Sequence, residues 1–104
     1  MELRVSSPGT DLADEDIDRI QKDLEKIDRR LNGLEDVFAE VRISDGGPAQ
    51  GYKVILELEY RRNHLMAKAS HNDMGLAVRE AREEILRQIN DRSRGGHSSF
   101  TKGL

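Results

Sequence analysis

Residues 17–34 read IDRIQKDLEKIDRRLNGL, the stretch with the clearest periodic pattern in the chain. Its apolar residues recur at steps of three and four, which places them along one side of an α-helix. These residues are Ile17, Ile20, Leu24, Ile27, Leu31 and Leu34. The pattern predicts a helix over residues 13–31 with one buried face. A coiled coil would need the repeat to continue through more heptads than this stretch contains.

Signals at both ends of the stretch support this helix. Asp11 or Asp14 is expected to cap the N-terminus, and further acids fill the first turns, where the helix dipole favours negative charge. Arg29 and Arg30 occupy the last turn, where the dipole favours positive charge. Asn32-Gly33 then provides a stop signal.

Strands are predicted on both sides of this helix from the alternation of apolar and polar residues. Residues 2–6 form the first strand, which ends at a turn signal. The alternation resumes in three further strands, at 37–44, 52–61 and 65–70. The glycine-rich residues 45–51 lack the Lys-Ser/Thr of a phosphate-binding loop, so they are interpreted as a hairpin connection.

A second helix follows the last strand. Asn72 or Asp73 is its expected N-cap, and Asn90-Asp91 its expected end. Its inward stripe consists of Met74, Ala77, Val78, Ala81, Ile85 and Ile89. The remaining residues, 92–104, are Ser, Gly, Arg and Lys with one aromatic residue, a composition that predicts a disordered basic tail.

The predicted elements define an α+β fold of β-α-β-β-β-α order. Both helices cover the apolar face of a four-stranded sheet, and the other face is left open to solvent, as antiparallel sheets tolerate. A chain of 104 residues holds one core. We therefore expect one domain over residues 1–91, followed by the tail.

Composition restricts the function classes. The chain has no cysteine, which excludes disulfides, cysteine-bearing zinc sites and thiol catalysis, and suits a reducing compartment. No stretch approaches the roughly 18 apolar residues of a membrane span. We expect a cytoplasmic protein that does not contact membranes.

Charge is unevenly distributed along the chain. The formal net charge is -3, which by itself argues against nucleic-acid binding. However, residues 11–28 hold eight acids against three bases, whereas residues 79–104 hold six bases against four acids. Twelve of the 17 basic residues are Arg, which favours bidentate contact with phosphate. The alternative interpretation is a solvated surface of mixed charge.

The candidate reactive residues do not form a recognisable catalytic or metal site. His64, His71 and His97 lack the spacing of metal ligands. Glu57 and Glu59 share a strand face, but an open sheet offers no water-excluding cleft that would tune paired carboxylates. We therefore expect neither an enzyme nor a cofactor, and no small-molecule substrate.

Two motifs point to a known family. Residues 65–74 read LMAKASHNDM, and Arg87-Gln88 follows near the end of the second helix; residues 23–29 read DLEKIDR in the first helix. These runs resemble the ribosome hibernation promoting factors, also called ribosome-associated inhibitor or sigma-54 modulation proteins, in their short form. The resemblance covers residues 1 to about 91 and implies a fold similar in outline to a double-stranded-RNA-binding domain.

The resemblance also implies a function. Such factors dock in the decoding channel of the small ribosomal subunit, where they exclude messenger and transfer RNA and idle the ribosome under stress. Their contacts run mainly from Lys and Arg to ribosomal RNA phosphates. The RNA-binding residues expected here are Lys26, Arg29, Arg30, Arg61, Arg62, Lys68 and Arg87, with the basic tail.

A second hypothesis keeps the fold and changes the partner. Asp23 and Glu84 stand where members of the family usually carry Lys, and the first helix is acidic. These charges would repel phosphate, so the alternative is a module that binds a protein or forms a homodimer and has lost ribosome binding.

Overall fold

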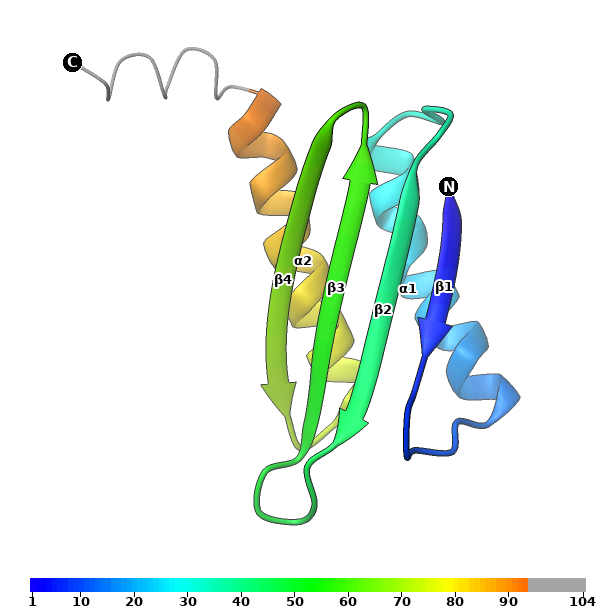
Figure 1. Ribbon diagram of the computed structural model, residues 1–104, viewed down its shortest axis with the longest axis vertical. Helices are drawn as coiled ribbons and strands as arrows, with labels where there is room; N and C mark the ends of the chain where they lie inside the picture. The colour runs from blue at the N-terminus through cyan, green and yellow to red at the C-terminus, as the bar shows by residue number, and fades with distance from the viewer. Residues whose placement is uncertain (94–104) are drawn as a thin grey trace, which may run out of the picture.

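The computed structural model describes residues 1–93, which follow the predicted order β-α-β-β-β-α. The elements are β1 (Glu2–Ser6), α1 (Asp14–Arg30), β2 (Phe38–Asp45), β3 (Tyr52–Tyr60), β4 (Asn63–His71) and α2 (Met74–Ser93). Figure 1 shows the strands as one sheet with both helices on the same side. The predicted α+β fold is confirmed.

The sheet has the strand order β1-β2-β3-β4. β1 pairs with β2 in parallel, and the other two pairs are antiparallel. A parallel pair needs a crossover connection, which α1 supplies, whereas the antiparallel pairs are joined by short loops. β1 and β4 are consequently the two edges of the sheet.

The core lies between the sheet and the helices. Within α1, Ile20, Leu24 and Ile27 of the predicted stripe are buried, the last two with no accessible surface, and Ile17 is partly buried. Ala77 and Ala81 of α2 are fully buried as well, and their small side chains let the helix approach its neighbours closely. No polar or charged residue within residues 1–92 is buried, so hydrophobic packing stabilises this domain, by about 1.5–3 kcal/mol for each large aliphatic side chain.

The start of α1 differs from the sequence prediction. Neither Asp11 nor Asp14 is the N-cap; Ala13 occupies that position and provides no side-chain cap. Asp16 compensates, because its carboxylate accepts a hydrogen bond of 3.2 Å from the backbone N–H of Ala13. The acid that caps this helix therefore lies inside the first turn, where its charge also interacts favourably with the helix dipole.

The end of α2 also differs. Asp73 caps its start as predicted, with its side chain accepting a hydrogen bond from the N–H of Leu76. The helix then continues through Asn90-Asp91, where it was predicted to end, and finishes at Ser93. Side-chain contacts hold this extra turn: Asp91 pairs with Arg87 at 2.9 Å, one helical turn earlier. The rest of the predicted tail, residues 94–104, lies outside the described residues.

The connection between β3 and β4 is shorter than predicted. β4 begins at Asn63 rather than at residue 65, which leaves only Arg61 and Arg62 between the strands. Arg61 adopts a left-handed backbone conformation with φ 53°. Gly or Asn normally occupies such a position in a tight turn, so an arginine here is held at some cost in strain.

Candidate functional site

Five arginines gather at one end of the molecule. Because α1 and α2 run in the same direction, both helices end beside the turn between β3 and β4, at the top of Figure 1. Arg29 and Arg30 come from the last turn of α1, Arg61 and Arg62 from that turn, and Arg92 from the last turn of α2. We call this group the basic pole.

A hollow of about 370 Å³ opens at the basic pole. Its lining combines three arginines with polar amides and an apolar floor, and it includes no carboxylate. The lining residues are Arg30, Leu31, Asn32, Leu34, Tyr60, Arg61, Asn63, Ile89 and Arg92. Positive charge without a nearby carboxylate is the arrangement that attracts an anion.

Neutral partners orient two of these arginines. Arg30 Nε donates a hydrogen bond of 2.8 Å to Asn90 Oδ1, and Arg92 Nη1 donates one of 3.1 Å to Asn63 Oδ1. An amide oxygen holds a guanidinium in place without cancelling its charge. Each guanidinium has five N–H donors, so most of them stay available to a phosphate.

Three of the predicted RNA-binding residues belong to the basic pole and are exposed. They are Arg29, Arg61 and Arg62, and none of them forms an ion pair within residues 1–93. Arg30, also predicted, lines the hollow together with Arg61. The structure therefore brings together four of the seven predicted RNA-binding residues.

Lys26 and Arg87 lie along the helices and are paired with acids. Lys26 Nζ is 3.4 Å from Glu83 Oε2, and Arg87 forms ion pairs with Glu84 and Asp91. A hydrogen bond from Arg87, followed by one from Gln88, holds the pKa of Glu84 below its usual value. These local carboxylates offset the positive charge that Lys26 and Arg87 would present to RNA.

Lys68 lies on a different surface. Alternation along β4 sends Leu65 and Ala67 into the core and Lys68 to the open face of the sheet, opposite Ile55. The helices, with their basic residues, cover the other face. The structure therefore does not bring Lys68 together with the predicted helix residues.

Sequence reasoning expected Arg92 to bind RNA only as part of the basic tail and did not place it on α2. It was assigned to the tail, although it stands three residues after Ile89, as the next step of the helical period. Extending the stripe of Ile85 and Ile89 by one turn would have found it. Tyr60 and Asn63 were missed because only the three-dimensional position of the β3–β4 turn places them in the hollow.

The described residues show no centre for metal binding and no helix suited to a membrane. No group of three or more His, Asp or Glu side chains within residues 1–93 is placed to hold a metal ion. No helix in the same range has the length and apolar character of a membrane span. His64 instead pairs with Glu57, their Nε2 and Oε2 atoms being 2.8 Å apart on the exposed face of the sheet.

Comparisons with known proteins agree with this fold. The structure superposes on the crystal structure of the Thermus thermophilus Protein Y N-terminal domain with a TM-score of 0.74 and 18% identity, covering 86% of this chain and 96% of that one. A ribosomal subunit interface protein from Coxiella burnetii gives a TM-score of 0.72 and 15% identity, covering 89% and 98%. No curated protein sequence matches the chain significantly.

The family comparison covers almost the whole described chain. The model of the family described as Sigma 54 modulation protein / S30EA ribosomal protein matches residues 3–94. Its members are ribosome-associated factors without enzymatic activity, so the expectation that this protein is not an enzyme is confirmed. The motifs of the β4–α2 connection and of α1, the fold and this match lead to one conclusion: the chain belongs to the Sigma 54 modulation protein / S30EA ribosomal protein family.

Proposed function

We propose that this protein binds the small ribosomal subunit through its basic pole, occupies the decoding channel and thereby idles the ribosome under stress. The observation that carries the proposal is the hollow lined by Arg30, Arg61 and Arg92 without any carboxylate. Inhibition is steric, because messenger and transfer RNA cannot enter a channel that the domain fills. The protein acts in the cytoplasm, where ribosomes are.

The geometry of the hollow suits an RNA backbone. Arginine guanidinium groups bind phosphate oxygens through pairs of parallel hydrogen bonds. Arg30 and Arg92 are held by amide side chains before any RNA arrives, which lowers the entropy lost on binding. Phosphate contacts of this kind are independent of base sequence and read the shape of the RNA.

The distribution of charge favours one orientation. The first turn of α1 carries Asp14, Glu15 and Asp16, and it lies at the opposite end of the helix from Arg29 and Arg30. Phosphates repel the acidic start of α1 and attract its basic end. The protein would therefore approach RNA with the basic pole leading, despite its net charge of -3.

The relatives support the same partner. The similar protein from Coxiella burnetii is described as a ribosomal subunit interface protein. The interface of the small subunit is the surface onto which the decoding channel opens, so a protein that fills the channel also lies at that interface.

Sedimentation with ribosomal subunits tests the proposal. The purified protein should travel with small subunits in a low-salt gradient and be released as salt rises, because phosphate contacts exchange with counterions. Added in excess to a cell-free translation reaction, it should lower protein synthesis. Recovery only at the top of the low-salt gradient would contradict the proposal.

A matched pair of variants locates the binding site. Arg30→Glu should weaken binding at every salt concentration, whereas Arg19→Glu should have little effect. Arg19 is exposed in the acidic half of α1, away from the basic pole, and the change in charge is the same. Equal losses in the two variants would show that binding follows net charge rather than the hollow.

A further inference from the structure

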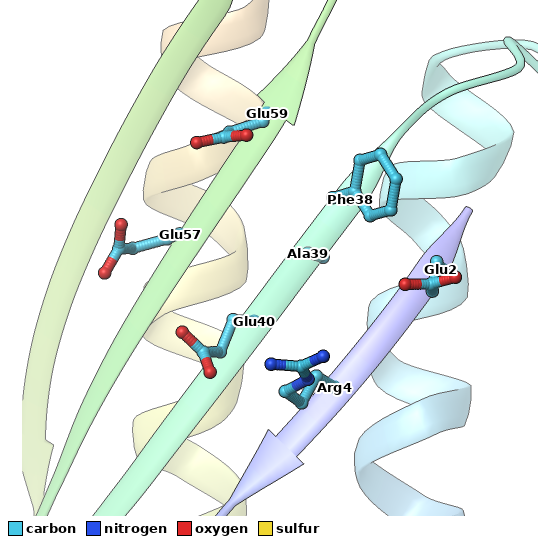
Figure 2. Close-up of a pocket in the computed structure, with 7 residues that line it drawn as sticks. All are labelled: Glu2, Arg4, Phe38, Ala39, Glu40, Glu57 and Glu59. Atoms are coloured by element: carbon cyan, nitrogen blue, oxygen red, sulfur yellow. The ribbon is translucent and has the colours of Figure 1, made fainter.

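The open face of the sheet has a simple chemical order. Cross-strand neighbours form rows across the sheet, and the rows nearest the β3–β4 turn carry acids. Glu2, Phe38 and Glu59 are adjacent in one such row, and Arg4, Glu40 and Glu57 in the next, so that one arginine stands among four carboxylates. Figure 2 shows these side chains around a hollow of about 300 Å³. This half of the face is the acidic half.

The other half of the same face is basic. Arg42, Lys53 and Lys68 lie in the rows nearest the loop between β2 and β3. Ile55 lies between Arg42 and Lys68 in one row. The face therefore changes sign along the strand direction.

Large apolar groups lie among these charges. Phe38 is 49% exposed in the acidic half and Met66 is 42% exposed at the β4 edge. Within residues 1–93 neither Glu2 nor Glu59, the neighbours of Phe38, forms an ion pair. The face offers apolar area together with charges that have no partner in the described part of the chain.

We propose that a second copy of this chain covers the open face, with its strands antiparallel to those of the first. A dimer with two-fold symmetry requires a self-complementary surface. Two arrangements keep the strands of facing sheets aligned. If the strands of the two copies were parallel, Glu40 would face Glu57 of the second copy, and the two carboxylates would repel each other. With antiparallel strands, the acidic half of each copy covers the basic half of the other.

The register of the sheet specifies the contacts of the antiparallel dimer. The two-fold axis passes beside Val41, between Glu40 and Arg42. Glu40 of each copy therefore faces Arg42 of the other copy. Glu59 then faces Lys53 of the second copy on the next strand. Glu40 and Arg42 are already 3.7 Å apart within one chain, and the dimer would complete a square of four alternating charges.

The size of the face sets the expected strength. It measures roughly 20 Å along the strands and about 15 Å across them. An interface of this area is below the standard size of specific ones and in the range of weak, transient contacts, so we expect reversible association with a dissociation constant on the order of 100 µM. The basic poles would lie at opposite ends of the dimer, outside the interface, so this proposal is independent of RNA binding.

Reversing the charges next to the two-fold axis tests the proposal. Sedimentation equilibrium over a range of concentrations should show a monomer–dimer equilibrium for the wild-type chain. Glu40→Arg and Arg42→Glu should each raise the dissociation constant about tenfold or more, because like charges then face each other twice. The double variant should dimerise again, and a mixture of the two single variants should form heterodimers.

Control variants and contrary results complete the experiment. Arg19→Glu carries the same charge change outside the face and should dimerise as the wild type does, and circular dichroism confirms that each variant is folded. A wild-type chain that stays monomeric at millimolar concentration would overturn the proposal and leave the face to a different partner. Dimerisation that neither single variant weakens would overturn it as well, since the copies would then meet elsewhere.

Discussion

The guanidinium of Arg92 donates a hydrogen bond of 3.1 Å to the side-chain oxygen of Asn63, and so joins the last turn of α2 to the start of β4. The contact orients a charged side chain by means of a neutral one. Charge and orientation at the basic pole can therefore be separated by substitution.

Arg92→Ala and Asn63→Ala should weaken binding to the small subunit in different ways. Loss of Arg92 removes a phosphate contact, so the slope of log affinity against log salt should fall by about one unit or slightly less. Loss of Asn63 removes only the orienting hydrogen bond, worth about 0.5–1.5 kcal/mol, and should leave the salt slope unchanged. Equal changes of slope in both variants would contradict this division of roles.

Arg61→Gly should stabilise the protein and weaken its binding to RNA. Glycine adopts the left-handed conformation of Arg61 without steric strain, which should raise the free energy of unfolding by about 1 kcal/mol. The same change removes an exposed cation from the hollow. Thermal melting and gradient sedimentation measure the two effects. A lower melting temperature would show that Arg61 makes stabilising contacts that outweigh its strain.

Glu84→Gln should strengthen binding to the small subunit. Glu84 engages the guanidinium of Arg87, and glutamine keeps the shape of the side chain without its charge. Arg87 then keeps only its ion pair with Asp91, so part of its guanidinium can reach a phosphate, which should steepen the salt dependence of binding. Glu80→Gln is a suitable control, because Glu80 is exposed on the same helix and forms no ion pair within residues 1–93. An equal gain in the control would indicate a general charge effect.

The same carboxylate should add a small pH dependence to stability. Hydrogen bonds from Arg87 and then Gln88 lower the pKa of Glu84 below its ordinary value in the folded chain. Its stabilising contribution is therefore complete above pH 4.5 and is lost as the pH falls through the lower folded pKa. Because the pair is exposed, solvent screening should keep the effect small. Chemical denaturation of wild type and Glu84→Gln at pH 7 and pH 3 should show the difference shrinking at pH 3.

Leu24→Ala tests the predicted inward face of α1. Leu24 is fully buried, so the substitution should lower the free energy of unfolding by roughly 2–5 kcal/mol. Lys22→Ala, at an exposed position of the same helix, should have almost no effect. Equal melting temperatures for the two variants would show that the buried face has been assigned wrongly.

Periodicity predicted the fold because each element buries a regular stripe. Leu24 and Ile27 followed the helical period, and Val41 and Leu56 followed the strand period, so their burial could be deduced from local sequence alone. The helix ends were harder to predict. The contact of Arg92 with Asn63 joins residues far apart in the chain, and the local sign of the extra turn, the continued period of Ile85 and Ile89, was outweighed by Asn90-Asp91, residues that disfavour a helix interior.

The candidate site was predictable only in part, for a related reason. Charge along the sequence indicated that Arg29 and Arg30 end one helix, and the turn at Arg61 and Arg62 was recognisable. Alternation along β4 also predicted that Lys68 lies on the open face, away from the helix arginines. The pairing of Arg87 with Glu84, by contrast, depends on side-chain conformation, which the period of a helix permits but does not require.

The parallel pairing of β1 with β2 has a consequence for folding kinetics. It joins Glu2 to Phe38, which lie 36 residues apart in the sequence. β3 and β4, by contrast, are joined by the two-residue turn between Tyr60 and Asn63. Closing the longer loop loses more entropy before any contact compensates for it. The meander of β2, β3 and β4 should therefore form early, and β1 should dock late. Shortening the side chain of Val5 in β1 to alanine should then accelerate unfolding and leave the folding rate almost unchanged.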